Sequence, residues 1–198
     1  MQRPQSLAGL IDVARDAIYA RVKEGERASA VAHHIFSALE TAVGNEIGEP
    51  ETLPVCRYLE PALDNARAGP APIAALAEAF QAIRPILRWQ RRIDAESLGA
   101  SFYDGHANTW LVGPNGLEPR SDVIVGASLL APGIRYPDHD HPPEELYVVM
   151  SEGEWFEEHR GWYTPGVGGI VYHPSGVTHA MRSGAVPLLA LWCLWAAR

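Results

Sequence analysis

The chain has 198 residues, a hydrophobic fraction of 47% and a formal net charge of −8 at pH 7. This length suits one sizeable domain, or one domain with an attached subdomain, and the hydrophobic fraction argues against intrinsic disorder. The negative charge, together with the lack of a block of basic residues, argues against nucleic acid as the main partner.

Neither a membrane nor a disulfide framework is indicated. No stretch approaches the roughly 18 apolar residues that a membrane-spanning helix needs, and the first residues lack the apolar run of a secretory signal. Cys56 and Cys193 match no metal-binding or redox spacing, so we expect two buried free thiols. We therefore expect a cytoplasmic protein without a membrane partner.

Residues 1–92 are expected to form an N-terminal helical segment. Apolar residues recur at helical spacing, which predicts helices over 6–23, 28–43 and 73–83. Ser6 is the expected cap of the first helix, and a short helical piece after residue 54 is expected to be interrupted at Pro61. The amphipathic stripes need a partner surface, so we expect this segment to pack on the rest of the chain and to help form a homodimer, without supplying a metal ligand.

The remaining residues, 93–198, have the sequence pattern of a β-domain. From about residue 101, short runs of Val, Ile, Leu, Trp and Tyr alternate with Gly, Pro, Asn and Asp, which is typical of a sandwich or barrel. We predict strands near residues 109–112, 123–130, 146–150, 154–159, 169–172, 178–182 and 188–195. The layout favours a mainly β fold, a double-stranded jelly-roll barrel with the helical segment packed outside it.

Three potential metal ligands lie close together in this β-domain, with His139 and His141 two positions apart and Glu145 four positions further on. Two imidazoles and a carboxylate suit one divalent transition metal, namely Zn, Fe, Mn, Co or Ni. On an extended chain both histidines point to the same side. The best candidate for a fourth ligand is His179, in a second turn-rich stretch.

These two stretches resemble the two conserved motifs of the cupin superfamily. The first matches a glycine–HxH–glutamate–glycine pattern, with one extra residue before the last glycine: Gly133, His139, His141, Glu145 and Gly153. The second matches a glycine–PxG–histidine pattern: Gly168, Pro174, Gly176 and His179. Ser183 stands where the family usually has an asparagine that is not a ligand. The resemblance covers roughly the C-terminal half and implies a cupin barrel.

Two tyrosines lie near the expected ligands. Tyr147 follows Glu145 by two positions, so on a strand the two side chains point into the same cavity. Tyr136 precedes His139 by three positions. A phenol has an ordinary pKa of about 10, but a nearby divalent cation stabilises the phenolate and makes it a usable base.

This array, behind an N-terminal helical segment in so short a chain, resembles the cupin-type dimethylsulfoniopropionate (DMSP) lyases, the DddL, DddQ and DddW group. The resemblance implies that His139, His141, Glu145 and His179 hold the metal. It also implies that Tyr147 is the catalytic base and that Tyr136 lies near the substrate. The implied reaction is β-elimination of DMSP, a small sulfonium carboxylate, to dimethyl sulfide and acrylate.

A cationic substrate favours aromatic walls through cation–π attraction. The candidates for such a wall are Trp155, Trp162, Tyr163 and Trp192. Two other readings stay open at this point: another metal-dependent cupin enzyme, such as an Fe(II) dioxygenase, and a non-enzymatic cupin that binds a small molecule. Tyr147 favours the lyase, because an oxygenase has no evident use for a base there.

Overall fold

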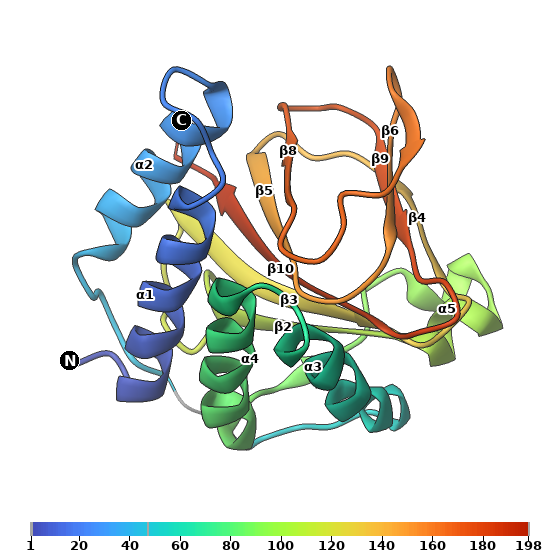
Figure 1. Ribbon diagram of the computed structural model, residues 1–198. Helices are drawn as coiled ribbons and strands as arrows, with labels where there is room; N and C mark the ends of the chain where they lie inside the picture. The colour runs from blue at the N-terminus through green and yellow to red at the C-terminus, as the bar shows by residue number, and fades with distance from the viewer. Residues whose placement is uncertain (1, 47, 198) are drawn as a thin grey trace.

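Two antiparallel sheets face each other and form a jelly-roll barrel, which confirms the predicted fold class (Figure 1). The structure, a computed structural model, describes residues 2–46 and 48–197. The larger sheet has the order β1-β2-β3-β10-β5-β8 and the smaller one β4-β9-β6-β7. The strands are β1 (Trp89–Gln90), β2 (His106–Val112), β3 (Val123–Leu130), β4 (Arg135–His139), β5 (Glu144–Val149), β6 (Glu154–Glu157), β7 (Gly161–Tyr163), β8 (Ile170–His173), β9 (His179–Arg182) and β10 (Leu188–Trp195).

Both faces of the larger sheet are buried, which explains the continuous apolar runs of its central strands. Along β10, Leu189, Leu191 and Cys193 belong to the core shared with the helices. The alternate residues of the same strand, Trp192 among them, belong to a second core inside the barrel. Because successive side chains of a strand point to opposite faces, this alternation sets which residues can reach the barrel interior.

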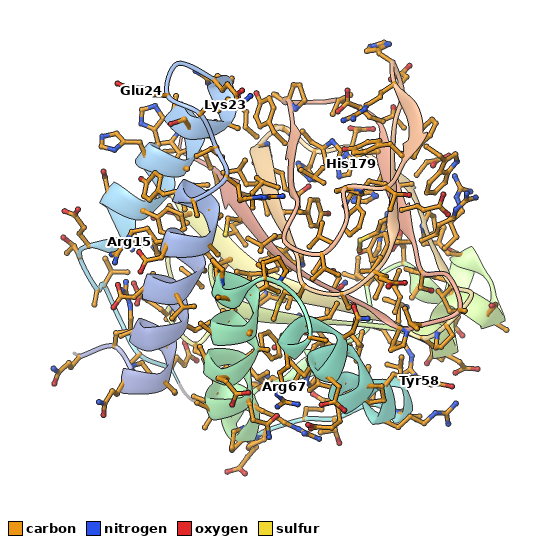
Figure 2. All side chains as sticks on the ribbon, in the orientation of Figure 1. Arg15, Lys23, Glu24, Tyr58, Arg67 and His179 are labelled. Carbon is orange, nitrogen blue, oxygen red and sulfur yellow. The ribbon has the colours of Figure 1, made fainter. Side chains whose placement is uncertain are left out.

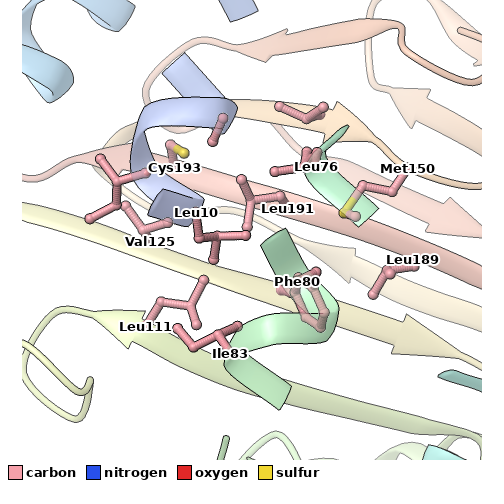
Figure 3. Close-up of a cluster of buried hydrophobic side chains, with 14 of the residues drawn as sticks. Leu10, Leu76, Phe80, Ile83, Leu111, Val125, Met150, Leu189, Leu191 and Cys193 are labelled. Atoms are coloured by element: carbon pink, nitrogen blue, oxygen red, sulfur yellow. The ribbon is translucent and has the colours of Figure 1, made fainter. Parts of the chain in front are cut away.

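Four helices cover the outer face of the larger sheet, and a fifth lies at the far end of the barrel (Figure 1). They are α1 (Gln5–Tyr19), α2 (Arg27–Leu39), α3 (Leu59–Arg67), α4 (Ala71–Ile83) and α5 (Ala100–Gly105), with 3₁₀ turns at Pro54–Tyr58, Arg84–Ile86 and Ala95–Leu98. Figure 3 shows Leu10 of α1 and Phe80 of α4 among the buried side chains of the strands.

Three local predictions in the helical segment were wrong. The first helix begins at Gln5 after Pro4, so Ser6 lies inside it and caps nothing. Pro61 does not interrupt its helix, because it occupies the first turn of α3, where the missing N–H has no helical partner to lose. The segment is also not wholly helical, since β1 joins the larger sheet beside β2.

Two expectations from composition can be compared with the structure. Cys56 and Cys193 are both free, although only Cys193 is buried and Cys56 is half-buried. Among residues 2–46 and 48–197, no helix combines the length and the apolar character needed to cross a membrane.

Candidate active site

The three candidate histidines and Glu145 come from both sheets and meet inside the barrel. His139 ends β4 and pairs in register with His179 at the start of β9, next to a bulge in the β4–β9 ladder. Glu145 lies on β5 of the larger sheet, on the same face as Tyr147. Figure 2 shows His179 on the barrel side of the molecule, away from the helices.

A backbone hydrogen bond joins the two motif stretches. Gly176 N–H donates to the carbonyl of His141 at 3.0 Å, which holds the loop before His179 against the loop that carries His141. Gly176 has a φ of 71°, a left-handed conformation that glycine adopts without steric cost. The left-handed φ explains why a glycine stands here, three residues before His179.

Backbone carbonyls determine the tautomer of each candidate histidine. Nδ1 of His139, His141 and His179 each lies 2.9 Å from a carbonyl oxygen, that of Pro137, Pro143 and Val177 respectively. A carbonyl only accepts, so each Nδ1 carries a hydrogen and each Nε2 is left as the ligating nitrogen. Hydrogen bonding of the far ring nitrogen is how proteins orient histidine ligands toward a metal.

The ligand atoms of the three histidines lie within 4.8 Å of one another, close enough to share one ion. Oε2 of Glu145 lies 3.2 Å from Nε2 of His141 and 3.1 Å from Nε2 of His179. Nε2 of His179 is nevertheless a buried atom without a hydrogen-bond partner in the described part of the chain. A carboxylate and imidazole lone pairs facing one another require positive charge between them, so this donor set fits a divalent cation.

The charges of the site follow from burial and from mutual contact. Burial, and then the nearby His179, lower the pKa of His139 to about 4, so this imidazole is neutral at pH 7. Burial would raise the pKa of Glu145, but the adjacent imidazoles of His141 and His179 outweigh burial and lower that pKa to about 2. The carboxyl of Glu145 is therefore ionised over the physiological range.

A cavity of about 630 Å³ opens onto the site and contains His139, His141 and Glu145 in its wall. This volume suits a small-molecule ligand. Arg91 and Arg92 lie at the cavity, and Ile93 beside them is fully exposed. Its remaining lining residues are Gln90, Asn108, Trp110, Asn115, Ile124, Ser128, Tyr136, Pro143, Tyr147, Trp192 and Leu194.

Both candidate catalytic tyrosines line this cavity and both are buried. Burial, and then the negative charge of Glu145, raise the pKa of Tyr147 well above its ordinary value. Burial also raises the pKa of Tyr136, against a hydrogen bond from Asn108 that lowers it. The phenolate form of Tyr147 therefore needs positive charge nearby.

The four aromatic candidates separate in space. Trp192 lines the cavity, and its ring makes an edge contact with Trp110, with 5.7 Å between the ring centroids. Trp155 is fully buried behind Tyr147 and does not line the cavity. Trp162 lies under the guanidinium of Arg182, and Tyr163 under that of Arg160, both outside the cavity lining.

Several residues of the site were not singled out from the sequence. His173 is fully buried with its ring stacked on His179, 4.2 Å between centroids, and its Nδ1 lies 3.3 Å from Glu157. Its place six residues before His179 in the second motif was an available signal. No signal in the sequence pointed to Trp110, Asn108 or Ser128, because only the sheet register brings these residues to the cavity.

Comparison with known proteins finds similarity to dimethylsulfoniopropionate lyases. The model of the dimethylsulfoniopropionate lyase family matches residues 27–190. The dimethylsulfoniopropionate lyase DddQ of Ruegeria pomeroyi is 34% identical over 123 residues, which are 62% of this chain and 61% of that protein. The putative lyase DddL of Cereibacter sphaeroides is 25% identical over 146 residues, 74% of this chain and 60% of that protein. The chain thus spans about three fifths of these curated relatives.

Solved structures extend the likeness over nearly the whole chain. The crystal structure of DddQ from Ruegeria pomeroyi has a TM-score of 0.67 and 25% identity, and covers 96% of this chain and 91% of that one. A chain from the crystal structures of the lyases RdDddP and RnDddQII has a TM-score of 0.70 at 24% identity, and covers 97% and 93%. The second likeness concerns the fold alone.

Proposed function

The chain belongs to the dimethylsulfoniopropionate lyase family, and from this premise we propose that it cleaves DMSP to dimethyl sulfide and acrylate by β-elimination. One observation carries the proposal. Three imidazoles and a carboxylate that fit a divalent cation lie together, and two of these imidazoles and the carboxylate line a small cavity with two phenols, one of which lies beside the carboxylate.

The proposed ligands are His139, His141, Glu145 and His179. The three Nδ1–H···O=C bonds support this assignment, because they leave the Nε2 atoms without hydrogens at the place where they converge. When bound, a divalent cation acts as a Lewis acid that draws charge from the substrate carboxylate and acidifies the adjacent C–H. Zn, Fe, Mn, Co and Ni all suit this ligand set.

Tyr147 is the proposed base. Its phenolate oxygen takes the α-proton of DMSP, and the electrons of that C–H bond form the new C=C bond of acrylate. The β-carbon–sulfur bond breaks, and its electron pair leaves with the sulfur as neutral dimethyl sulfide. A sulfonium needs no proton to leave, so the only proton in the balance passes to Tyr147 and from there to solvent.

The proposed wall for the sulfonium group is the indole pair of Trp192 and Trp110. Both line the cavity, and each aromatic face offers a cation about 0.5–2 kcal/mol. Trp155, Trp162 and Tyr163 lie outside the cavity lining, so we propose that they contribute packing and not substrate contacts.

Headspace analysis of purified protein tests the function directly. Given DMSP, the metal-replete protein should release dimethyl sulfide and leave an equal amount of acrylate. Chelation should abolish the release, because the cation that acidifies the substrate C–H is then removed. Addition of the metal should restore the release. Absence of dimethyl sulfide from the metal-replete protein would leave a dioxygenase or a binding cupin as the better reading.

We also propose that residues 1–92 form a mainly helical segment that contributes to a homodimer, and that residues 93–198 carry the metal and the barrel strands other than β1. Helices α1–α4 cover buried residues of β3, β5 and β10, so deleting residues 1–92 should expose apolar surface and cause aggregation. Light scattering on the full chain and on the deletion variant measures both points. A soluble, fully active deletion variant contradicts the structural role, and a monomeric full chain contradicts only the dimer.

A further inference from the structure

A chain of three hydrogen bonds runs along the cavity wall from Trp192 to Tyr136. The indole N–H of Trp192 donates to Oγ of Ser128 at 3.0 Å, and that hydroxyl donates to Oδ1 of Asn108 at 2.7 Å. Nδ2 of Asn108 then donates to the hydroxyl oxygen of Tyr136 at 3.2 Å. All four residues line the cavity.

Each of the three bonds runs in the same direction along the chain, from Trp192 toward Tyr136. An indole N–H only donates, so Ser128 accepts there and has a single hydrogen left to give. Oδ1 of Asn108 is the acceptor for that hydrogen, which turns the Nδ2 end of the amide toward Tyr136. The hydroxyl oxygen of Tyr136 is therefore an acceptor toward the wall, and its own hydrogen must point elsewhere.

The sheet holds this chain in place. Ser128 of β3 pairs in register with Asn108 of β2, so both side chains stand next to each other on the inner face. Gly126 leaves room for Trp192, since a Cβ at that glycine would lie 2.3 Å from the indole ring. Ser128 is 3% exposed, so solvent offers no competing partner.

The hydrogen of Tyr136 has no protein acceptor within residues 2–46 and 48–197, and the phenol faces the cavity. Its ring lies 5.0 Å from that of His139, centroid to centroid, and the guanidinium of Arg92 lies 5.7 Å from its centroid. A hydroxyl donor flanked by a proposed metal ligand and a cation is suited to an anionic group of a bound molecule.

We propose that Asn108 and Ser128 are positioning residues that turn the Tyr136 hydroxyl into the cavity as a hydrogen-bond donor to the substrate carboxylate. This inference rests on the proposed function. It gives the two phenols different roles: Tyr136 binds and orients the carboxylate of the substrate, and Tyr147 takes the α-proton.

Asn108→Asp tests the polarity without changing the shape. An ionised Asp still accepts from Ser128 but cannot donate, so the Tyr136 hydroxyl must turn and donate to it. Calorimetry with acrylate, which has the carboxylate but neither sulfonium nor an acidic α-proton, should show binding weakened by about tenfold or more, as for a lost hydrogen bond to a charged group. Tyr136→Phe should weaken it to a similar extent.

The double variant Asn108→Asp, Tyr136→Phe tests whether Asn108 acts by positioning Tyr136 or whether its substitution disturbs the cavity in general. If Asn108 acts through Tyr136, Asn108→Asp should weaken acrylate binding much less in the Tyr136→Phe background than in the wild type, because only the repulsion of its added charge is left there. Asn115→Asp is the matched control, since it adds the same charge at the rim of the same cavity; any loss it causes should be equal in both backgrounds. An equal effect of Asn108→Asp with and without the Tyr136 hydroxyl overturns the proposal, as does an unchanged affinity.

Ser128→Ala reaches the same contact by a second route. It removes the hydrogen that holds Oδ1 of Asn108, so the amide can turn and accept from Tyr136. Because this variant adds no charge, acrylate affinity should fall only while the Tyr136 hydroxyl is present. If the wild type releases no dimethyl sulfide but the coupling in acrylate binding is measured, the lyase proposal is wrong and the inference holds. If the wild type binds no acrylate, the inference itself is wrong.

Discussion

Tyr147→Phe should lower kcat for dimethyl sulfide release by about 10²- to 10⁴-fold, the usual contribution of a general base. The substitution removes one oxygen from a buried ring that packs against Trp155 and His173, so shape and packing are kept. KM should change little, because the hydroxyl of Tyr147 is not assigned to binding the carboxylate.

The pH dependence of the rate provides a second test of Tyr147→Phe. Burial, and then the charge of Glu145, raise the pKa of Tyr147, so at neutral pH the protein by itself keeps the phenol protonated. The rate should therefore rise on the alkaline side as the phenol ionises. We expect an apparent pKa below that of free tyrosine, because a bound cation and the sulfonium oppose the effect of burial. In Tyr147→Phe this rising limb should be lost.

Tyr163→Phe is the matched control for this experiment. It removes the same atom from a half-buried tyrosine outside the cavity lining, and its kcat should stay within about twofold of the wild type, because the change touches neither a proposed ligand nor a substrate contact. A metal-replete Tyr147→Phe protein that releases dimethyl sulfide at a near-normal rate would rule out Tyr147 as the base.

The second large effect concerns the metal. The double variant His141→Ala, His179→Ala should lose the ion almost entirely, from about one per chain, and should lose activity to the level of the chelated wild type. Only His139 and Glu145 would remain of the proposed set, and two ligands hold a divalent transition metal far more weakly than four. Metal analysis by mass spectrometry after dialysis, together with the headspace assay, measures both quantities.

His159→Ala serves as the control, because His159 is exposed and outside the cluster. It should keep the metal content and the activity of the wild type. Circular dichroism of the double variant should show the wild-type β-sheet signal, so that lost metal is not confused with lost fold. Full metal content in the folded double variant would refute the proposed ligand set.

Strand positions were predictable where the pattern of the chain is local. The strands predicted over 123–130 and 188–195 agree with β3 and β10, because long apolar runs are typical of strands buried on both faces. β1, β4 and β7 were not predicted as strands. β4 carries the polar run Arg135–His139, and it is a strand because it pairs with β9, forty or more residues away along the chain.

The placing of Tyr147 beside Glu145 was likewise a local matter. Side chains two positions apart on a strand share a face whatever the rest of the fold does. The choice among the tryptophans was not local. Trp155 and Trp192 both lie on strands, yet Trp155 is fully buried behind Tyr147 whereas Trp192 reaches the cavity between β3 and β5.

By itself, therefore, the sequence determined the fold class and the family, because motif spacing and strand periodicity depend only on neighbouring residues. The tertiary structure brought His173, Asn108 and Ser128 to the site. Asn108 and Ser128 meet only because β2 and β3 pair in one register, and a shift of one residue would turn either side chain to the other face of the sheet. Such contacts depend on distances between strands, which the order of residues along the chain does not specify.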